Sequence, residues 1–200
     1  MNADQPLFEL SAAWQAAFWC CCSLWWAMEL WIFARDRRSA RGRSEDRGSR
    51  TAIVVLYYMA NGLAFAAAYL GWGIAIPGPP RALLLAAFAL ILGGAALRLW
   101  SVLTLGRFFR TAVFVQDDHE LISRGPYRVL RNPSYSGVLA SMSGLGLALG
   151  NWLSLVAAVG FPLLGFVWRI CVEEASLRRQ FGDAYTAYAR RRWALIPLVW

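Results

Sequence analysis

Polar residues that could do chemistry gather in two blocks on either side of two consecutive apolar runs. The first block covers residues 106–135 and contains the only histidine of the chain, His119. The second covers residues 169–192 and begins with Arg169, Glu173 and Glu174. Arg169 and Glu173 are four residues apart, so on a helix they share one face. Charged side chains at the end of an apolar helix are energetically costly unless they are neutralised or have a function. The pair therefore indicates either a functional site or an ion pair that reaches the lipid headgroups.

The stretch GPYRVLRNPSYSG, residues 125–137, closes the first block. Gly125 and Pro126 predict a turn, Asn132 is a good helix cap, and Pro133 suits the first turn of a helix. These structural roles leave five donors and aromatic rings unexplained: His119, Tyr127, Arg128, Arg131 and Tyr135. They surround the start of a helix, where exposed backbone amides favour an anionic ligand such as a carboxylate.

The elements that must position these blocks are membrane helices. A content of 58% hydrophobic and 16% charged residues, with eleven tryptophans, predicts an all-α integral membrane protein with about five transmembrane helices. The apolar runs cover residues 10–34, 52–76, 82–105, 135–150 and 152–172. The last two are separated by Gly150 and Asn151, which predicts a C-terminal helical hairpin that brings both polar blocks to one membrane side. We expect one membrane domain over residues 1–200, with three N-terminal spans in 1–105 and the catalytic region in 106–200.

Smaller features extend this prediction. The fourth run is short and carries small residues four apart, Gly137 with Ser141 and Gly146 with Gly150 among them, a spacing that lets helices approach closely in lipid. Leu177, Phe181, Tyr185 and Tyr188 recur at helical spacing and predict an amphipathic helix on the cytosolic membrane surface, where packing and anchoring explain them. Glu29 and Arg98 lie within apolar runs, so they either pair or line a common cavity.

The charges predict the orientation. Arginines fill the segments after the first, third and fifth runs, whereas the opposite side has only Arg81. The positive-inside rule therefore places the N-terminus outside and the active site and C-terminus in the cytosol. All twenty basic residues are arginine, which hints at a bacterial inner membrane. The net charge of +8 is explained by headgroups and topology, so we expect no nucleic-acid partner. The four cysteines show no metal-ligand spacing, and we expect no metal.

The order of the motifs resembles the isoprenylcysteine carboxyl methyltransferase family, which is related to phospholipid methyltransferases. The resemblance covers residues 105–190 and rests on His119-Glu120-Leu121, Gly125-Pro126-Tyr127-Arg128, Arg131-Asn132-Pro133-Ser134-Tyr135-Ser136-Gly137, Arg169, Glu173-Glu174, Leu177, Phe181-Gly182, Tyr185 and Tyr188. It implies that S-adenosylmethionine is bound in a cytosolic pocket by His119, Glu120, Leu121, Ile122, Tyr127, Asn132, Pro133, Ser134, Tyr135 and Glu173. It also implies that Arg169 and Glu173 are catalytic. Asn132 stands where the family usually has histidine, and an amide cannot titrate near neutral pH.

The methyl acceptor that this resemblance implies is a lipidic or isoprenylated molecule from the bilayer. A carboxylate acceptor is already ionised at neutral pH and needs no general base, so Arg169 would orient it. An amine headgroup, as in a phospholipid N-methyltransferase, would need Glu173 or Glu174 as base. Two competing functions are a sterol-reductase-like enzyme that uses NADPH and a non-catalytic protein of the same fold. The oligomeric state stays open.

Overall fold

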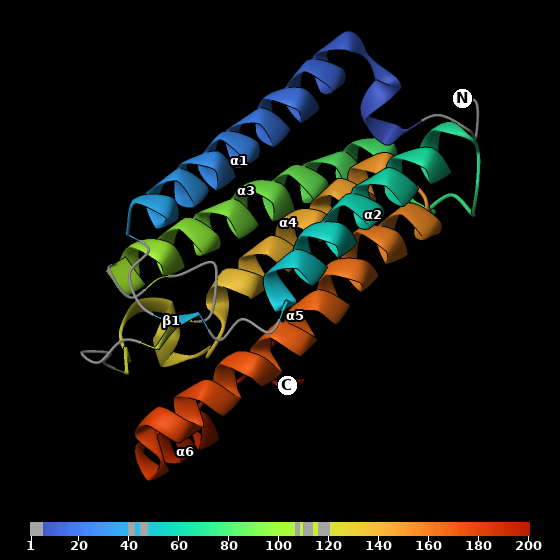
Figure 1. Ribbon diagram of the computed structural model, residues 1–200. Coiled ribbons are helices and arrows are strands. Elements are labelled where there is room, and N and C mark those ends of the chain that lie inside the picture. Colours follow the sequence, from blue (N-terminus) through green and yellow to red (C-terminus); the bar gives the residue numbers. More distant parts are fainter. Residues whose placement is uncertain (1–5, 40–42, 45–47, 107–108, 110–113, 116–120) are drawn as a thin grey trace.

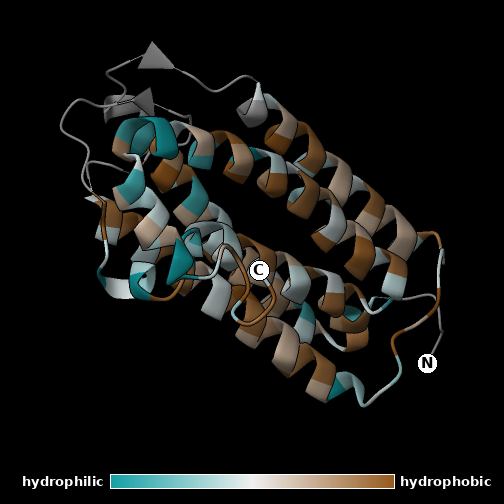
Figure 2. Ribbon diagram, turned by 90° about the horizontal axis from the view of Figure 1, so that it is seen from below, coloured by the Kyte–Doolittle hydropathy of each residue, from teal (hydrophilic) through white to brown (hydrophobic). Residues whose placement is uncertain are grey.

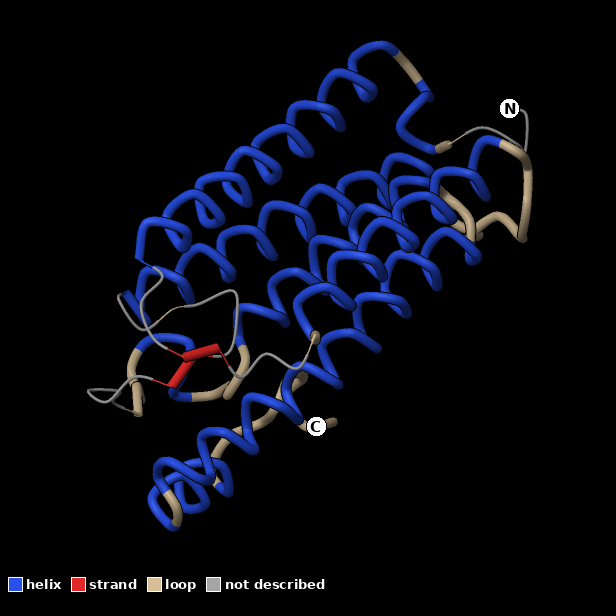
Figure 3. Tube along the Cα trace, in the orientation of Figure 1, coloured by secondary structure: helices blue, strands red, loops and turns tan. Residues whose placement is uncertain are grey.

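The computed structural model describes residues 6–39, 43–44, 48–106, 109, 114–115 and 121–200, and these residues are almost entirely helical (Figures 1 and 3). The elements are η1 (Leu7–Leu10), α1 (Ala12–Ser39), α2 (Ser49–Tyr69), α3 (Pro80–Leu105), η3 (Gly125–Arg128), α4 (Pro133–Leu149), α5 (Trp152–Phe181) and α6 (Asp183–Arg190). Two short strands, β1 (Arg43–Ser44) and β2 (Phe114–Val115), pair antiparallel.

Five of these helices form the bundle that the apolar runs predict. Within the described residues, α1, α2, α3 and α5 are long and apolar enough to cross a membrane, and the chain is an integral membrane protein. The remaining helix of the bundle, α4, has 17 residues and lies between α3 and α5 in the middle of the bundle (Figure 1). Because neighbours cover it on several sides, most of its residues are buried.

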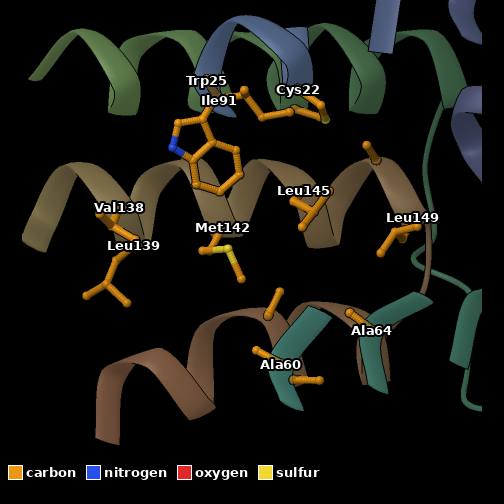
Figure 4. Close-up of a cluster of buried hydrophobic side chains, with 14 of the residues drawn as sticks. Cys22, Trp25, Ala60, Ala64, Ile91, Val138, Leu139, Met142, Leu145 and Leu149 are labelled. Atoms are coloured by element: carbon orange, nitrogen blue, oxygen red, sulfur yellow. The ribbon is translucent and has the colours of Figure 1, made fainter. Parts of the chain in front are cut away.

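The buried core forms where α4 meets its neighbours. Figure 4 shows Met142 and Leu145 of α4 between Trp25 of α1 on one side and Ala60 and Ala64 of α2 on the other. Small residues in α2 and large ones in α1 fill the space beside the same central helix. The core therefore joins N-terminal and C-terminal helices into one packed unit.

The predicted close approach of helices is made between α3 and α4. A Cβ atom added at Gly137 would lie 2.6 Å from the carbonyl oxygen of Gly94, and one at Gly144 would lie 2.5 Å from that of Ala87. Ser141 Oγ donates across the same contact to the Ile91 carbonyl at 3.0 Å. Larger side chains would separate the two helices, so small residues hold α4 against α3.

The C-terminal hairpin is confirmed, but two boundaries differ from the prediction. Gly150 adopts a φ of 84° after α4, and Asn151 caps α5 by accepting from Ser154 N at 2.7 Å. The second helix ends at Tyr69 rather than near residue 76. Helix α5 runs to Phe181 instead of ending at Val172. Its polar last turns consist mostly of good helix formers that also make ion pairs, which explains why the helix continues.

The amphipathic helix predicted from Leu177, Phe181, Tyr185 and Tyr188 is present, but it is confined to α6. Gly182, with a φ of 53°, separates the last turn of α5 from α6. Leu177 therefore belongs to the long helix, whereas Tyr185 and Tyr188 belong to the short one that folds back beside it (Figure 1). Tyr185 is buried, which agrees with the packing role that the sequence indicates. Helical periodicity continues across Gly182 in the sequence, so the pattern did not reveal the break.

Hydrophilic residues gather toward one end of the bundle, where α5 finishes and α6 lies (Figure 2). We call this the polar end; α3 also finishes there, and η3 and the start of α4 belong to it. The hairpin of α4 and α5 thus brings residues 121–135 and 169–190 together, as the sequence predicts.

Candidate active site

One cavity of about 860 Å³ lies partly at the polar end and partly between the helices. Its walls come from α1, α2, α3, η3, α4, α5 and α6. Side chains with polar groups line one part of it, including Tyr127, Arg131, Glu173, Glu174, Tyr185 and Tyr188. Mainly apolar side chains of α1 and α2 line another part, including Trp26, Leu30, Phe33, Val54, Tyr58 and Phe65. The cavity therefore joins a charged compartment to an apolar one.

A buried cluster on α4 and α5 forms one wall of the charged compartment. Arg169 Nε donates to Glu173 Oε1 at 2.7 Å, and the Tyr135 hydroxyl donates to the same oxygen at 2.9 Å. Arg169 Nε also lies 3.3 Å from the Tyr135 hydroxyl oxygen. The Tyr135 ring stacks on Phe166 at a centroid distance of 4.8 Å, which fixes the position of the hydroxyl. Glu173 is thus held from two helices.

The two predicted catalytic residues differ in their access to the cavity. The Glu173 side chain is 23% exposed and lines the cavity, whereas that of Arg169 is 1% exposed and lies behind it. The guanidinium therefore faces the cavity through Glu173 and Tyr135. In this arrangement Arg169 orients a neighbouring carboxylate, and a ligand carboxylate could reach it only by displacing Glu173 or Tyr135.

Glu174, the next residue along α5, is held by different cations. Arg131 NH1 donates to Glu174 Oε1 at 2.6 Å, and Arg178 NH2 donates to Oε2 at 3.1 Å. Arg131 comes from the loop before α4, so this ion pair ties that loop to the last turns of α5. Two adjacent carboxylates consequently point to separate, defined partners at the polar end.

Glu29 and Arg98 form an ion pair with each other, and both line the cavity. Both of the alternatives that the sequence leaves open for these two residues are therefore realised. Arg98 NH2 donates to Glu29 Oε2 at 2.7 Å, and its Nε faces the other carboxylate oxygen. Arg98 NH1 donates to Ser134 Oγ at 2.9 Å. One arginine of α3 therefore connects α1 to the first turn of α4, and its charge is balanced within the apolar bundle.

Tyrosines of η3 and α6 also line the cavity. Gly125 takes a φ of 56° and opens the turn that carries Tyr127, as the Gly-Pro pair predicts. Burial raises the pKa of Tyr127 well above its ordinary value, and burial together with Glu174 raises the pKa of Tyr185. Both phenols therefore keep their protons and can donate hydrogen bonds at neutral pH.

Asn132 is the N-cap residue of α4, as predicted, but its side chain makes no capping hydrogen bond. Its Nδ2 instead donates to the carbonyl of Ala194 at 3.1 Å. The side chain therefore contacts the C-terminal tail, far away in sequence, and not the first turn of α4.

Most of the residues predicted to bind the cosubstrate meet at this cavity. Its lining includes Leu121, Ile122, Tyr127, Asn132, Ser134, Tyr135 and Glu173. Pro133 is buried beside them and starts α4. His119 and Glu120 lie outside the described residues, so their predicted role stays a prediction.

Sequence reasoning missed several lining residues. Packing and anchoring explain Leu177, Tyr185 and Tyr188 in the sequence, but all three face the cavity. The ion pair of Arg131 with Glu174 is not predicted either. The spacing of Arg131 and Glu174 from the turn of the hairpin is a usable signal, because residues similarly far from a turn lie near one another in an antiparallel pair.

Known proteins are similar to this chain in sequence. A family model described as phospholipid methyltransferase matches residues 82–184, which is more than half of the chain. A probable protein-S-isoprenylcysteine O-methyltransferase of Oryza sativa subsp. japonica is 36% identical over 112 residues, or 55% of this chain and 59% of the relative. Protein-S-isoprenylcysteine O-methyltransferase B of Arabidopsis thaliana is 34% identical, over 55% of this chain and 57% of the relative.

A solved structure is similar in fold. The structure of a eukaryotic intramembrane Ras methyltransferase, an isoprenylcysteine carboxyl methyltransferase, superimposes with a TM-score of 0.59 at 25% identity. The match covers 73% of this chain and 52% of the other. The chain thus spans a little more than half the length of each of these three relatives.

Proposed function

The chain belongs to the phospholipid methyltransferase family, and from this premise we propose that it is a membrane-embedded methyltransferase. It uses S-adenosylmethionine to methylate the carboxylate of a lipidic, isoprenylcysteine-like acceptor. The observation that carries the proposal is the continuous cavity that joins a charged compartment to an apolar one. Such a cavity suits a reaction between a polar donor from the cytosol and an acceptor whose chain stays in the bilayer.

The residues of the charged compartment fit the methyl donor. S-adenosylmethionine carries a methyl group on a cationic sulfonium, together with an amino and a carboxylate group, and supplies that methyl to a nucleophile. Carboxylates and tyrosine faces attract cations, and Glu173, Glu174, Tyr185 and Tyr188 provide both. Arg131 provides a cation for a carboxylate. His119 and Glu120, with Leu121 and Ile122, belong to the proposed donor site by their resemblance to the family.

Catalysis by these residues is mainly positioning. Glu173 faces the compartment from a fixed orientation because Arg169 and Tyr135 hold the same carboxylate oxygen. An ionised carboxylate acceptor needs no base, so the site has only to bring the two reacting groups together and exclude water. Arg169 acts through Glu173 and Tyr135, which makes it a positioning residue in this proposal.

The acceptor chain occupies the apolar compartment. Its walls belong to α1 and α2, and Trp26, Leu30 and Val54 provide apolar surface at the level of the membrane. A lipid or prenyl chain can enter this compartment from the bilayer at little cost, because both surroundings are apolar. The polar end then lies at the cytosolic face, as the arginine-rich segments predict, with the N-terminus outside.

Calorimetric titration of the detergent-purified protein tests the proposal, with S-adenosylmethionine and NADPH as separate ligands. We expect the methyl donor to bind and NADPH not to bind. Glu173→Gln should weaken donor binding by at least about tenfold, since it removes a charge that faces the cationic donor. The control is Glu9→Gln, because Glu9 lies in η1 at the opposite end of the bundle.

Transfer of a labelled methyl group then identifies the acceptor. A prenylated N-acetylcysteine should be methylated, whereas its methyl ester, which lacks the free carboxylate, should not. Methylation of phosphatidylethanolamine in its place would overturn the carboxylate assignment while keeping the methyltransferase. Absence of donor binding would overturn the proposed function itself.

A further inference from the structure

The C-terminal tail after α6 lies against the segment that leads into α4. Trp193 N donates to the Val129 carbonyl at 3.1 Å, and Arg131 N donates back to the Trp193 carbonyl at 2.8 Å. Asn132 N then donates to the Ala194 carbonyl at 3.1 Å. These backbone hydrogen bonds pair the two segments in parallel, like a short piece of sheet.

Side chains at the start of α4 add hydrogen bonds to this pairing. Asn132 Nδ2 donates to the same Ala194 carbonyl, and Ser136 Oγ donates to the Leu195 carbonyl at 2.5 Å. Ala194 and Leu195 are fully or almost fully buried. The tail is therefore packed into the protein at this point and is not a loose end.

Arg192 fastens the beginning of the tail. Its Nε donates to the Tyr127 carbonyl at 2.8 Å, and its NH1 donates to the Tyr188 carbonyl at 3.0 Å. The guanidinium also lies over the Tyr188 ring, 4.1 Å from the centroid. One side chain thereby connects η3, α6 and the tail.

The segment that the tail holds is a wall of the charged compartment. Residues 127–135 contribute Tyr127, Arg131, Ser134 and Tyr135 to the cavity lining. The residues between the end of η3 and the start of α4 do not belong to a helix, so helical hydrogen bonds do not satisfy all of their backbone amides. The amides of Arg131 and Asn132 are satisfied by carbonyls of the tail instead.

We propose that residues 192–195 form a clasp that positions residues 127–136 for the methyl donor, with Arg192 and Asn132 as its positioning side chains. The ordering of the segment stands independently of the reaction, whereas its effect on the donor rests on the proposed function. Asn132 has a defined task in this arrangement, namely to donate to the tail, and that task requires no titration.

Replacing Trp193 by proline tests the clasp, because proline has no amide hydrogen and cannot donate to Val129. Trp193→Ala is the matched control, since it keeps the amide and removes the half-exposed indole. In the protein without donor, hydrogen exchange at the amides of Arg131 and Asn132 should become about threefold to tenfold faster in Trp193→Pro, as the loss of one hydrogen bond predicts. Trp193→Ala should exchange like the wild type.

A second variant guards against a fold defect in the proline protein. Ser136→Ala removes the hydroxyl that donates to the Leu195 carbonyl, and Ser136 is not among the residues that line the cavity. Both variants should raise the dissociation constant of S-adenosylmethionine by about tenfold, while the KM for the lipid acceptor stays unchanged. A merely structural role would lower the melting temperature and leave the donor constant of the folded protein as it was.

The outcomes separate the two proposals. Equal exchange in wild type and Trp193→Pro would overturn the clasp whether or not the donor binds. Faster exchange with an unchanged donor constant would overturn the positioning of the donor. A wild-type protein that binds no donor would overturn the proposed function, and faster exchange in the variant would still support the clasp as the element that orders residues 127–136.

Discussion

Replacing Tyr135 by phenylalanine is the sharpest test of how Glu173 is held. The hydroxyl donates to Glu173 Oε1 at 2.9 Å and lies 3.3 Å from Arg169 Nε, so the substitution removes one atom from the middle of the cluster. The ring can stay on Phe166, because phenylalanine fits the same space. The variant should therefore fold and lose only the hydroxyl contacts.

The size of the effect follows from those contacts. A hydrogen bond to a charged group contributes about 1.5–3 kcal/mol, so the free energy of unfolding should fall by that amount. If Glu173 must be held in place before the methyl donor binds, the lower end of this range raises the dissociation constant of S-adenosylmethionine by about tenfold. Arg169 still donates to Glu173 at 2.7 Å, which keeps the loss partial.

The assay is calorimetric titration with the donor, together with thermal unfolding in detergent. Tyr69→Phe is the matched control, since the Tyr69 hydroxyl also donates to a glutamate, Glu9 Oε1, at 2.9 Å, but far from the cavity. Tyr69→Phe should bind the donor like the wild type. Wild-type affinity in Tyr135→Phe, or equal weakening in both variants, would refute the reasoning.

Three further predictions concern packing, the intramembrane ion pair and pH. Gly144→Leu should lower stability by about 1–3 kcal/mol or more in thermal unfolding, because its side chain would meet the Ala87 backbone of α3; Gly93→Leu, at a position with open space, should be neutral, and equal losses would contradict the packing. Glu29→Gln should cost about 2 kcal/mol, since it leaves Arg98 poorly paired at 12% side-chain exposure, and adding Arg98→Gln should restore part of that loss; an additive double variant would disprove the coupling. Tyr127 should cause no change in the affinity for the methyl donor between pH 7 and pH 9, because burial raises the pKa of Tyr127 above its ordinary value of about 10 and the phenol keeps its proton. A decline in affinity across this range that Tyr127→Phe abolishes would contradict this prediction.

Most of the helical framework was predictable from local sequence. Apolar runs of membrane-spanning length predicted the helices, and Gly150 with Asn151 predicted the hairpin. Boundaries were less accessible, because hydropathy reports where a helix leaves the membrane and not where it ends. The last turns of α5 continue past Val172 as a helix that carries Glu173 and Glu174 into the cavity wall.

The candidate site was predictable in membership more than in arrangement. The motif order placed Tyr127, Tyr135 and Glu173 together, and the structure brings them to one cavity. It did not predict that Arg169 would be covered by Glu173 and Tyr135, or that Asn132 would face the tail. These features depend on which side chain lies nearer to the cavity, and the spacing of residues in the sequence does not indicate how deeply each side chain is buried.

The sequence by itself determined the membrane class, the hairpin and the residue types of the site, because hydrophobic length, turn residues and local spacing act over neighbouring positions. Only the tertiary structure decided the pairing of Glu29 with Arg98, the contact of Arg131 with Glu174 and the docking of the tail on residues 129–136. Arg131 and Glu174 are 43 positions apart in the sequence, and Arg98 and Glu29 are 69 positions apart. Partners so distant are chosen by the packing of whole helices, which fixes the side chains that share a buried space and therefore must satisfy one another.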